Sequence, residues 1–99
     1  MALSESQKKY LRGLGHHLKP VVMIGESGLT ESVLQEFATS IAHHELIKVS
    51  VRAGDRQVRS EIIASLCASG AAELVQRIGN IALMYRANLK KKKRIVLPG

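Results

Sequence analysis

The pattern of apolar and polar positions predicts helices and strands in alternation along the first half of the chain. Ser4 followed by Gln7 has the spacing of a capping box, so we expect a helix there that ends before Pro20. Residues 21–24 are all apolar, which is typical of a strand buried on both faces. Thr30 is a good N-cap for a second helix, whose apolar residues recur at helical spacing.

The second half of the chain continues this alternation and ends in a hairpin. Residues 47–53 alternate strictly between apolar and polar side chains, as in a strand with one buried face. Asp55 caps a predicted third helix. Residues 73–78 and 81–86 then form two strands joined by a tight turn at Gly79-Asn80. The predicted element order is therefore α-β-α-β-α-β-β.

This order predicts a single α/β domain built on a four-stranded mixed sheet. Two strand–helix–strand units in succession favour parallel pairing with right-handed crossovers. We expect the helices to cover one face of the sheet and the other face to stay open. The open face then either is simply hydrated by charged residues or forms a basic platform that follows a nucleic-acid backbone. It lacks the aromatic residues that a base-stacking sheet uses. The side chains predicted to project from it are Lys48, Arg52, Arg77 and Arg86.

The charge balance favours a polyanionic partner. The chain of 99 residues carries 15 Lys and Arg against 8 Asp and Glu, a formal net charge of +7. The densest basic run is residues 90–94, so we divide the chain into a domain of residues 1–89 and a basic C-terminal tail of residues 90–99. Even a flexible tail would raise affinity for a polyanion by releasing counterions.

Composition also restricts the compartment. A lone cysteine, Cys67, cannot form an internal disulfide, which fits a reducing cytoplasm. No apolar run approaches the roughly 20 residues needed to cross a membrane. We therefore expect a cytoplasmic, monomeric protein with no membrane partner.

The junction between the first strand and the second helix contains a Gly-x-x-Gly loop made of Gly25, Glu26, Ser27 and Gly28. Glycines let the backbone turn sharply and approach another molecule closely, and the following helix N-terminus favours an anion such as phosphate. However, residues 21–45 contain four glutamates and no Lys or Arg, so the loop needs help from elsewhere. We expect a composite site in which the nearby charge comes from Lys8, Lys9, Arg12 and Lys19.

Catalysis and metal binding find little support in the residue pattern. The adjacent pairs His16-His17 and His43-His44 lie on helices, where neighbouring side chains point about 100° apart and rarely chelate one ion. Cys67 lies on an apolar helical face and is interpreted as a core residue. We therefore expect no catalytic residue, metal, cofactor or small-molecule substrate, and retain a small enzyme that uses Ser27 or a histidine only as an alternative.

Several runs of residues stand in a distinctive order and spacing: Leu11-Arg12-Gly13-Leu14, Leu18-Lys19-Pro20-Val21-Val22, Gly25-x-x-Gly28-Leu29-Thr30, His43-His44-Glu45-Leu46-Ile47-Lys48-Val49, Gln76-Arg77-Ile78-Gly79 and Leu83-Met84-Tyr85-Arg86. With these runs the chain resembles the CRM domain family (chloroplast RNA splicing and ribosome maturation), and within it the stand-alone bacterial YhbY-like proteins. The resemblance implies a fold similar to the C-terminal domain of translation initiation factor three. It also implies RNA binding that includes the Gly25-x-x-Gly28 loop, by partial analogy to KH domains.

The resemblance further implies a role in ribosome assembly, because bacterial stand-alone members are associated with precursors of the large ribosomal subunit. We expect a non-enzymatic protein that binds precursor ribosomal RNA. The alternative is a protein-interaction module that docks on a ribosomal protein or factor through its acidic second helix, which carries Glu31 and Glu36.

Overall fold

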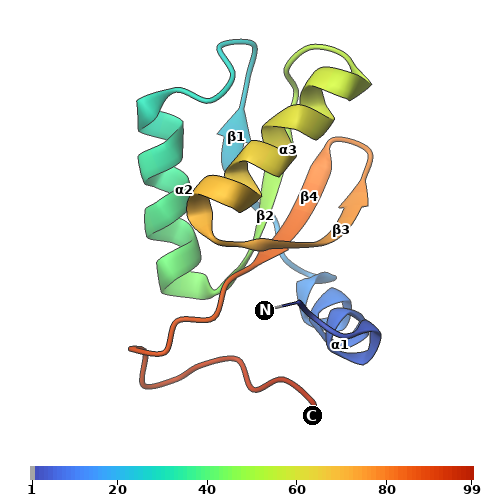
Figure 1. The fold of residues 1–99 in the computed structure, drawn as a ribbon, viewed down its shortest axis with the longest axis vertical. Coiled ribbons are helices and arrows are strands. Elements are labelled where there is room, and N and C mark those ends of the chain that lie inside the picture. The colour runs from blue at the N-terminus through green and yellow to red at the C-terminus, as the bar shows by residue number, and fades with distance from the viewer. Residues whose placement is uncertain (1) are drawn as a thin grey trace.

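A computed structural model describes residues 2–99, and its elements follow the predicted order (Figure 1). The fold class is confirmed: helices and a four-stranded mixed sheet form one α/β domain. The helices are α1 (Glu5–Gly15), α2 (Glu31–His44) and α3 (Arg56–Gly70), and the strands are β1 (Pro20–Ile24), β2 (Leu46–Val51), β3 (Glu73–Ile78) and β4 (Ile81–Tyr85).

Side-chain caps start each helix where the sequence predicts. Ser4 and Gln7 form the complete capping box of α1. The Thr30 hydroxyl accepts a hydrogen bond from the backbone N–H of Val33, and the Asp55 carboxylate accepts one from that of Val58. Each cap satisfies a backbone donor that the first helical turn leaves free.

The strands lie in the order β1-β2-β4-β3. β1 and β2 are parallel, whereas β4 is antiparallel to both of its neighbours. The crossovers β1–α2–β2 and β2–α3–β3 therefore step across the sheet in the same direction. Because such crossovers share one hand, α2 and α3 lie on the same face.

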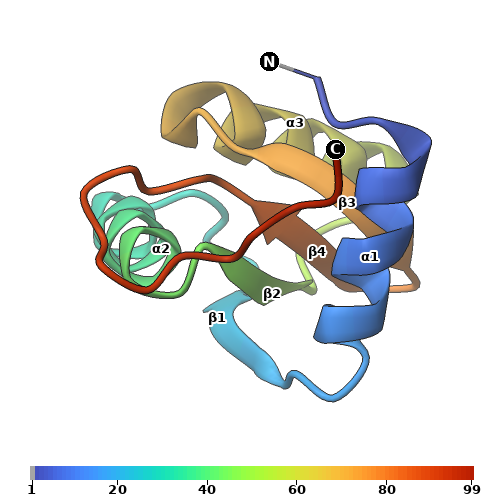
Figure 2. The ribbon, with the colours of Figure 1, turned by 90° about the horizontal axis from the view of Figure 1, so that it is seen from below.

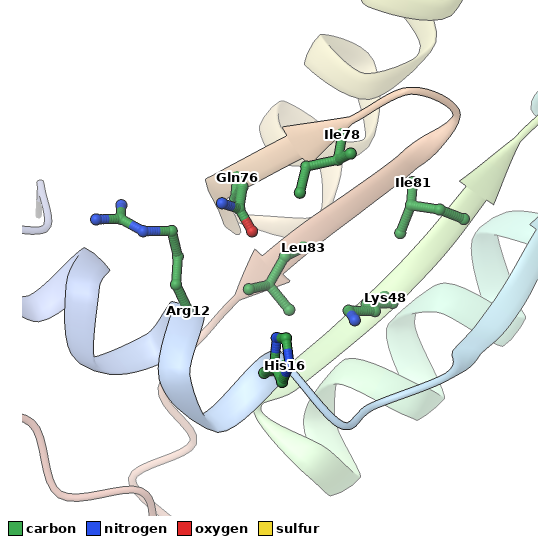
Figure 3. Close-up of a pocket in the computed structure, with 8 residues that line it drawn as sticks. Arg12, His16, Lys48, Gln76, Ile78, Ile81 and Leu83 are labelled. Atoms are coloured by element: carbon green, nitrogen blue, oxygen red, sulfur yellow. The ribbon is translucent and has the colours of Figure 1, made fainter.

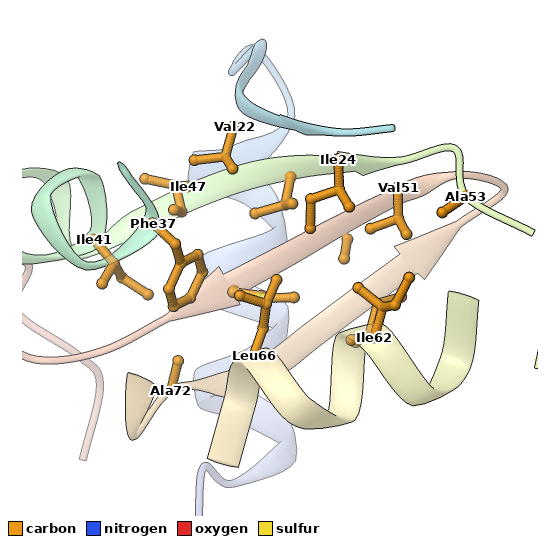
Figure 4. Close-up of a cluster of buried hydrophobic side chains, with 14 residues drawn as sticks. Val22, Ile24, Phe37, Ile41, Ile47, Val51, Ala53, Ile62, Leu66 and Ala72 are labelled. Carbon is orange, nitrogen blue, oxygen red and sulfur yellow. The ribbon is translucent and has the colours of Figure 1, made fainter. Parts of the chain in front are cut away.

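The main hydrophobic core fills the space between this face and helices α2 and α3 (Figure 4). Phe37 and Ile41 of α2 and Leu66 of α3 are almost completely buried there. The sheet contributes Val22, Ile24, Ile47, Val49, Val51, Ala82 and Met84.

The expectation that all helices cover one face is wrong for α1, which packs on the opposite face (Figure 2). Leu11 of α1 is fully buried there in a second, smaller core. No crossover between parallel strands contains α1, so the handedness rule does not assign its face. The position of α1 is instead set by packing of Leu11 against apolar side chains of the sheet: Leu46, Val75, Leu83 and Tyr85.

The expectation that β1 is buried on both faces is also wrong. β1 is an edge strand, and α1 reaches only part of its side of the sheet. Val21 and Met23 are therefore 44% and 58% exposed, while Val22 and Ile24 between them are buried. An apolar part of this face remains open to solvent.

A buried carboxylate holds the C-terminal tail onto the domain. Glu45 is 1% exposed, and its two carboxylate oxygens accept hydrogen bonds from the backbone N–H groups of Asn88 (2.7 Å) and Ile95 (2.8 Å). The backbone φ of Glu45 is 64°. This conformation is energetically unfavourable for any residue other than glycine. Ile95 and Leu97 then pack against the second core, as their apolar character favours.

We predict that Glu45→Gln lowers the free energy of unfolding by about 1–3 kcal/mol, the usual cost of an unsatisfied buried donor. A glutamine has a single acceptor oxygen, so one of the two backbone donors loses its partner. Urea unfolding followed by circular dichroism measures the change. Glu36→Gln, on the exposed side of α2, is the matched control and should change stability by less than about 0.5 kcal/mol. Equal stability of the two variants would contradict this role of Glu45.

Candidate functional site

Three connections meet at one end of the sheet, at the top of Figure 1. They are residues 25–30 between β1 and α2, residues 52–55 between β2 and α3, and the turn 79–80 between β3 and β4. Backbone hydrogen bonds join them, from the Arg52 N–H to the Ile24 carbonyl (2.8 Å) and from the Val51 N–H to the Asn80 carbonyl (2.7 Å). We call this region the three-loop end.

The Gly-x-x-Gly loop forms a closed turn at this end. The Gly28 N–H donates to the Gly25 carbonyl at 2.9 Å, and Gly28 has a φ of 68° that favours glycine. The Gly28 amide is thus already hydrogen-bonded within the turn. Within residues 2–99, the amides of Glu26 and Ser27 form no hydrogen bond and remain the donors of this loop.

Gly54 connects the loop to the neighbouring arginines. Its N–H lies 3.5 Å from a carboxylate oxygen of Glu26, and its carbonyl accepts a hydrogen bond from Arg59 at 2.8 Å. Gly54 has a φ of 58°, and a Cβ there would lie 2.8 Å from the side chain of Val58, so a larger residue does not fit. Glu26, which suits phosphate poorly, therefore has a structural contact.

Three arginines surround one cavity at the three-loop end. The cavity has a volume of about 330 Å³. Arg77 is oriented by a 2.7 Å hydrogen bond to the Ser60 hydroxyl of α3, and the Nε of Arg59 is buried without a partner within the described residues. Like charges brought this close repel one another unless an anion lies between them. We call this the arginine pocket, lined by Arg56, Arg59, Arg77, Gly79 and Asn80.

The sequence-based prediction did not include Arg56 and Arg59, although the sequence contains a signal for them. Both lie at the start of α3, whose first turn contains no acidic residue. Cations there oppose the helix dipole, at a cost of roughly 0.3–1 kcal/mol each. Arg56 is exposed at this unfavourable position, which makes its side chain a candidate for contact with an anion.

The cations of α1 do not flank the Gly-x-x-Gly loop, contrary to the expected composite site. α1 lies at the other end of the long axis from this loop (Figure 1). The ammonium nitrogen of Lys8 lies 3.8 Å from a carboxylate oxygen of Glu5. Lys9 lines a shallow surface beside Pro98. Lys19 precedes β1, so the full length of that strand separates it from the loop.

The predicted basic platform is divided between the two faces and the two ends of the sheet. Arg52, whose Nε lies 3.4 Å from the Ser50 hydroxyl, and Lys48 lie on the face of α1. Arg77 reaches α3 on the opposite face. Arg86 donates to the carbonyl of Gly70 (3.0 Å) at the C-terminal end of α3, which is a structural position. The alternation that predicts Lys48 and Ile47 on different faces of the sheet is confirmed. The register of the neighbouring strands, however, does not bring all four cations onto one face.

Other types of site are not supported by the described residues. Residues 2–99 contain no group of three His, Cys, Asp or Glu side chains that could hold a metal ion, nor any helix long and apolar enough to span a membrane. Burial, with a smaller contribution from Glu73, raises the pKa of the Cys67 thiol and disfavours a reactive thiolate. Burial and then Glu45 raise the pKa of Tyr85, against an opposing effect of Arg94.

Comparison with known proteins agrees with the motifs and the fold. The model of the CRS1 / YhbY (CRM) domain matches residues 3–86. A Pseudomonas aeruginosa protein named "Probable RNA-binding protein" is 46% identical over 96% of this chain and 91% of its own length. A Haemophilus influenzae protein named "RNA-binding protein" is 47% identical over 97% of this chain and 95% of its own. These names denote binding proteins and not enzymes.

A solved structure shares the whole fold. The solution structure of a hypothetical protein from Staphylococcus aureus superposes with a TM-score of 0.82 at 35% sequence identity, covering 98% of this chain and 100% of the other. The sequence match, the motifs and the fold agree over the same residues. The chain therefore belongs to the CRS1/YhbY (CRM) domain family.

Proposed function

We propose that this protein binds RNA through the phosphate backbone, with the three-loop end as the main contact. The observation that carries the proposal is the arginine pocket, a cavity lined by Arg56, Arg59 and Arg77. Guanidinium groups donate paired hydrogen bonds that match phosphate oxygens. Arg52 and the amides of Glu26 and Ser27 would extend the contact toward the Gly-x-x-Gly loop. The RNA-binding names of the relatives support the same chemistry.

The remaining predicted cations would give the complex its longer-range attraction. A net charge of +7 steers a polyanion toward the protein whichever residues finally touch it. Lys8, Lys9 and Lys19 are therefore assigned to this general effect, together with the tail lysines. Arg12 and Lys48 lie on the α1 face of the sheet and would meet RNA that continues past the three-loop end.

The natural RNA in this proposal is precursor ribosomal RNA of the large subunit, bound by a monomer in the cytoplasm during ribosome assembly. Membership of the CRM family supports this part of the proposal. A small basic domain with a rigid anion pocket would hold a local RNA conformation while assembly proceeds, without any catalytic group.

We predict that Arg56→Ala weakens binding to a fluorescently labelled ribosomal RNA hairpin about fivefold, the factor that corresponds to ~1 kcal/mol. The slope of log affinity against log salt should fall by about one, because one phosphate contact is lost. Arg56 is exposed and its charge opposes the dipole of α3, so the variant should be as stable as the wild type or more stable by up to about 1 kcal/mol. Fluorescence anisotropy over a series of KCl concentrations measures both quantities.

Lys19→Ala is the matched control for Arg56→Ala, since it removes one exposed cation from the opposite end of β1. Lys19→Ala should reduce the affinity for RNA less than Arg56→Ala does. It should also leave most of the slope of log affinity against log salt unchanged. Equal effects of the two variants would mean that net charge and not the arginine pocket determines binding.

We predict that the protein in a cell extract co-sediments with free large subunits or their precursors on a sucrose gradient, and that raised salt or Arg56→Ala/Arg77→Ala releases it. A protein that stays at the top of the gradient at low salt would refute the ribosomal part of the proposal. Co-sedimentation that survives nuclease but is lost in Glu31→Gln/Glu36→Gln would instead indicate a protein partner of α2, where both glutamates are exposed.

A further inference from the structure

Two rows of side chains cross the open part of the sheet between α1 and the three-loop end. Strand register places Met23, Ser50, Ile81 and Ile78 in the first row. The second row, nearer to α1, consists of Lys48, Leu83 and Gln76. Met23 and Ile78, at the two edges of the first row, are 58% and 68% exposed. This face is therefore aliphatic with polar groups beside it, and not the basic platform that the sequence suggests.

A cavity of about 230 Å³ opens where α1 stops covering the second row (Figure 3). The side chain of Leu83 forms its floor, and Ile78 and Ile81 stand on the side toward the hairpin. Gly15 permits this arrangement, because a Cβ there would lie 2.8 Å from the methyl carbons of Leu83. Polar groups border the apolar floor on the other sides: Arg12, His16, Lys48 and Gln76.

The lining suits a planar, neutral group that is attached to an anion. Leu83, Ile78 and Ile81 offer an apolar contact surface, and the Gln76 amide offers both a donor and an acceptor. Arg12 and Lys48 supply positive charge, and no acidic residue is part of the lining within the described chain. A purely apolar partner would leave Arg12, Lys48 and Gln76 without partners, while a bare phosphate would not use the aliphatic floor.

The volume of the cavity also limits the size of the group that it can hold. Sites for complete small-molecule ligands usually have volumes of roughly 300–1,000 Å³, above the 230 Å³ of this cavity. One heterocyclic ring fits this space better than a complete cofactor. Single-stranded RNA offers such rings, since its unstacked bases turn outward and pack against protein side chains.

We propose that this cavity receives one unpaired base of a bound RNA strand; the inference rests on the proposed RNA binding and adds a base contact to it. Leu83, Ile81 and Ile78 contact the face of the base, and the Gln76 amide bonds to its edge. The guanidinium of Arg12 extends away from the Leu83 floor (Figure 3), where it would hold the phosphate attached to the base, and Lys48 neutralises the neighbouring phosphate. Arg52 connects the two regions, because its backbone N–H donates to the Ile24 carbonyl beside the Gly-x-x-Gly loop and its Nε lies 3.4 Å from the Ser50 hydroxyl in the first row. One RNA strand would therefore contact both the cavity and the loop.

The experiment compares a single-stranded oligoadenylate with an abasic oligomer that has the same number of phosphates. Wild-type protein should bind the strand with bases about tenfold more tightly, a factor within the range of single base contacts. The ratio of the two affinities should fall toward one in Gln76→Ala and in Ile78→Ser. Neither substitution changes the net charge. Val96→Ser is the matched control, because Val96 is 80% exposed in the tail and far along the chain from the cavity.

The outcomes separate this inference from the proposed function. Equal binding of both strands by wild-type protein overturns the base site and leaves phosphate binding intact. Binding of neither strand overturns both proposals. If the preference persists in the two cavity variants, and sedimentation shows that Ile78→Ser converts a dimer into a monomer, the open face is an interface between copies of this chain and the inference is wrong.

A second measurement locates the base directly. Adenosine 5′-monophosphate should shift the methyl resonances of Ile78, Ile81 and Leu83 through its ring current, whereas ribose 5-phosphate, which has no ring, should not. Shifts confined to other residues, or equal shifts with both compounds, would refute the assignment of the base to this cavity.

Discussion

The shared handedness of the two crossovers is the constraint on which the rest of the structure depends. Because β1–α2–β2 and β2–α3–β3 step the same way across the sheet, α2 and α3 must lie on one face. Within residues 2–99, the opposite face is covered by α1, with Leu3 just before it, and by the C-terminal tail. Both are too short to cover four strands, so an aliphatic strip with Met23 and Ile78 at its edges stays exposed. The same parallel pairing brings the C-terminal ends of β1 and β2 together, which places their loops side by side.

The charge arrangement at the three-loop end does not favour the stability of α3. Arg56 and Arg59 oppose the dipole of α3, and Arg77 approaches them from β3. Elsewhere the fold uses its cations favourably: Arg86 bonds to the C-terminal end of α3, and the Lys91 ammonium bonds to the His43 carbonyl at the end of α2. Arg59 and Arg77 also bond to the fold, at the Gly54 carbonyl and the Ser60 hydroxyl, and these bonds fix where their charges lie.

Glu45 explains why the tail lies against the domain. A buried carboxylate without hydrogen-bond donors would be strongly destabilising, so the two amides of the tail and the carboxylate depend on each other. The basic run that follows β4 is thereby held near the C-terminal end of α2 (Figure 2). Its charge acts from a defined place on the surface.

The sequence by itself determined the elements, their order and the family, because caps, alternation and glycine positions are local properties. The alternation in β2 correctly placed Lys48 opposite Ile47 and Val49, and the capping residues located all three helices. Only the tertiary structure decided the face of α1 and the grouping of the cations, because these depend on strand order and register. Lys19 and Arg12 are near the loop in sequence but not in space, whereas Arg77 reaches Arg56 and Arg59 through the hairpin. The arginine pocket and the base cavity are therefore consequences of the β1-β2-β4-β3 order, which no local pattern encodes.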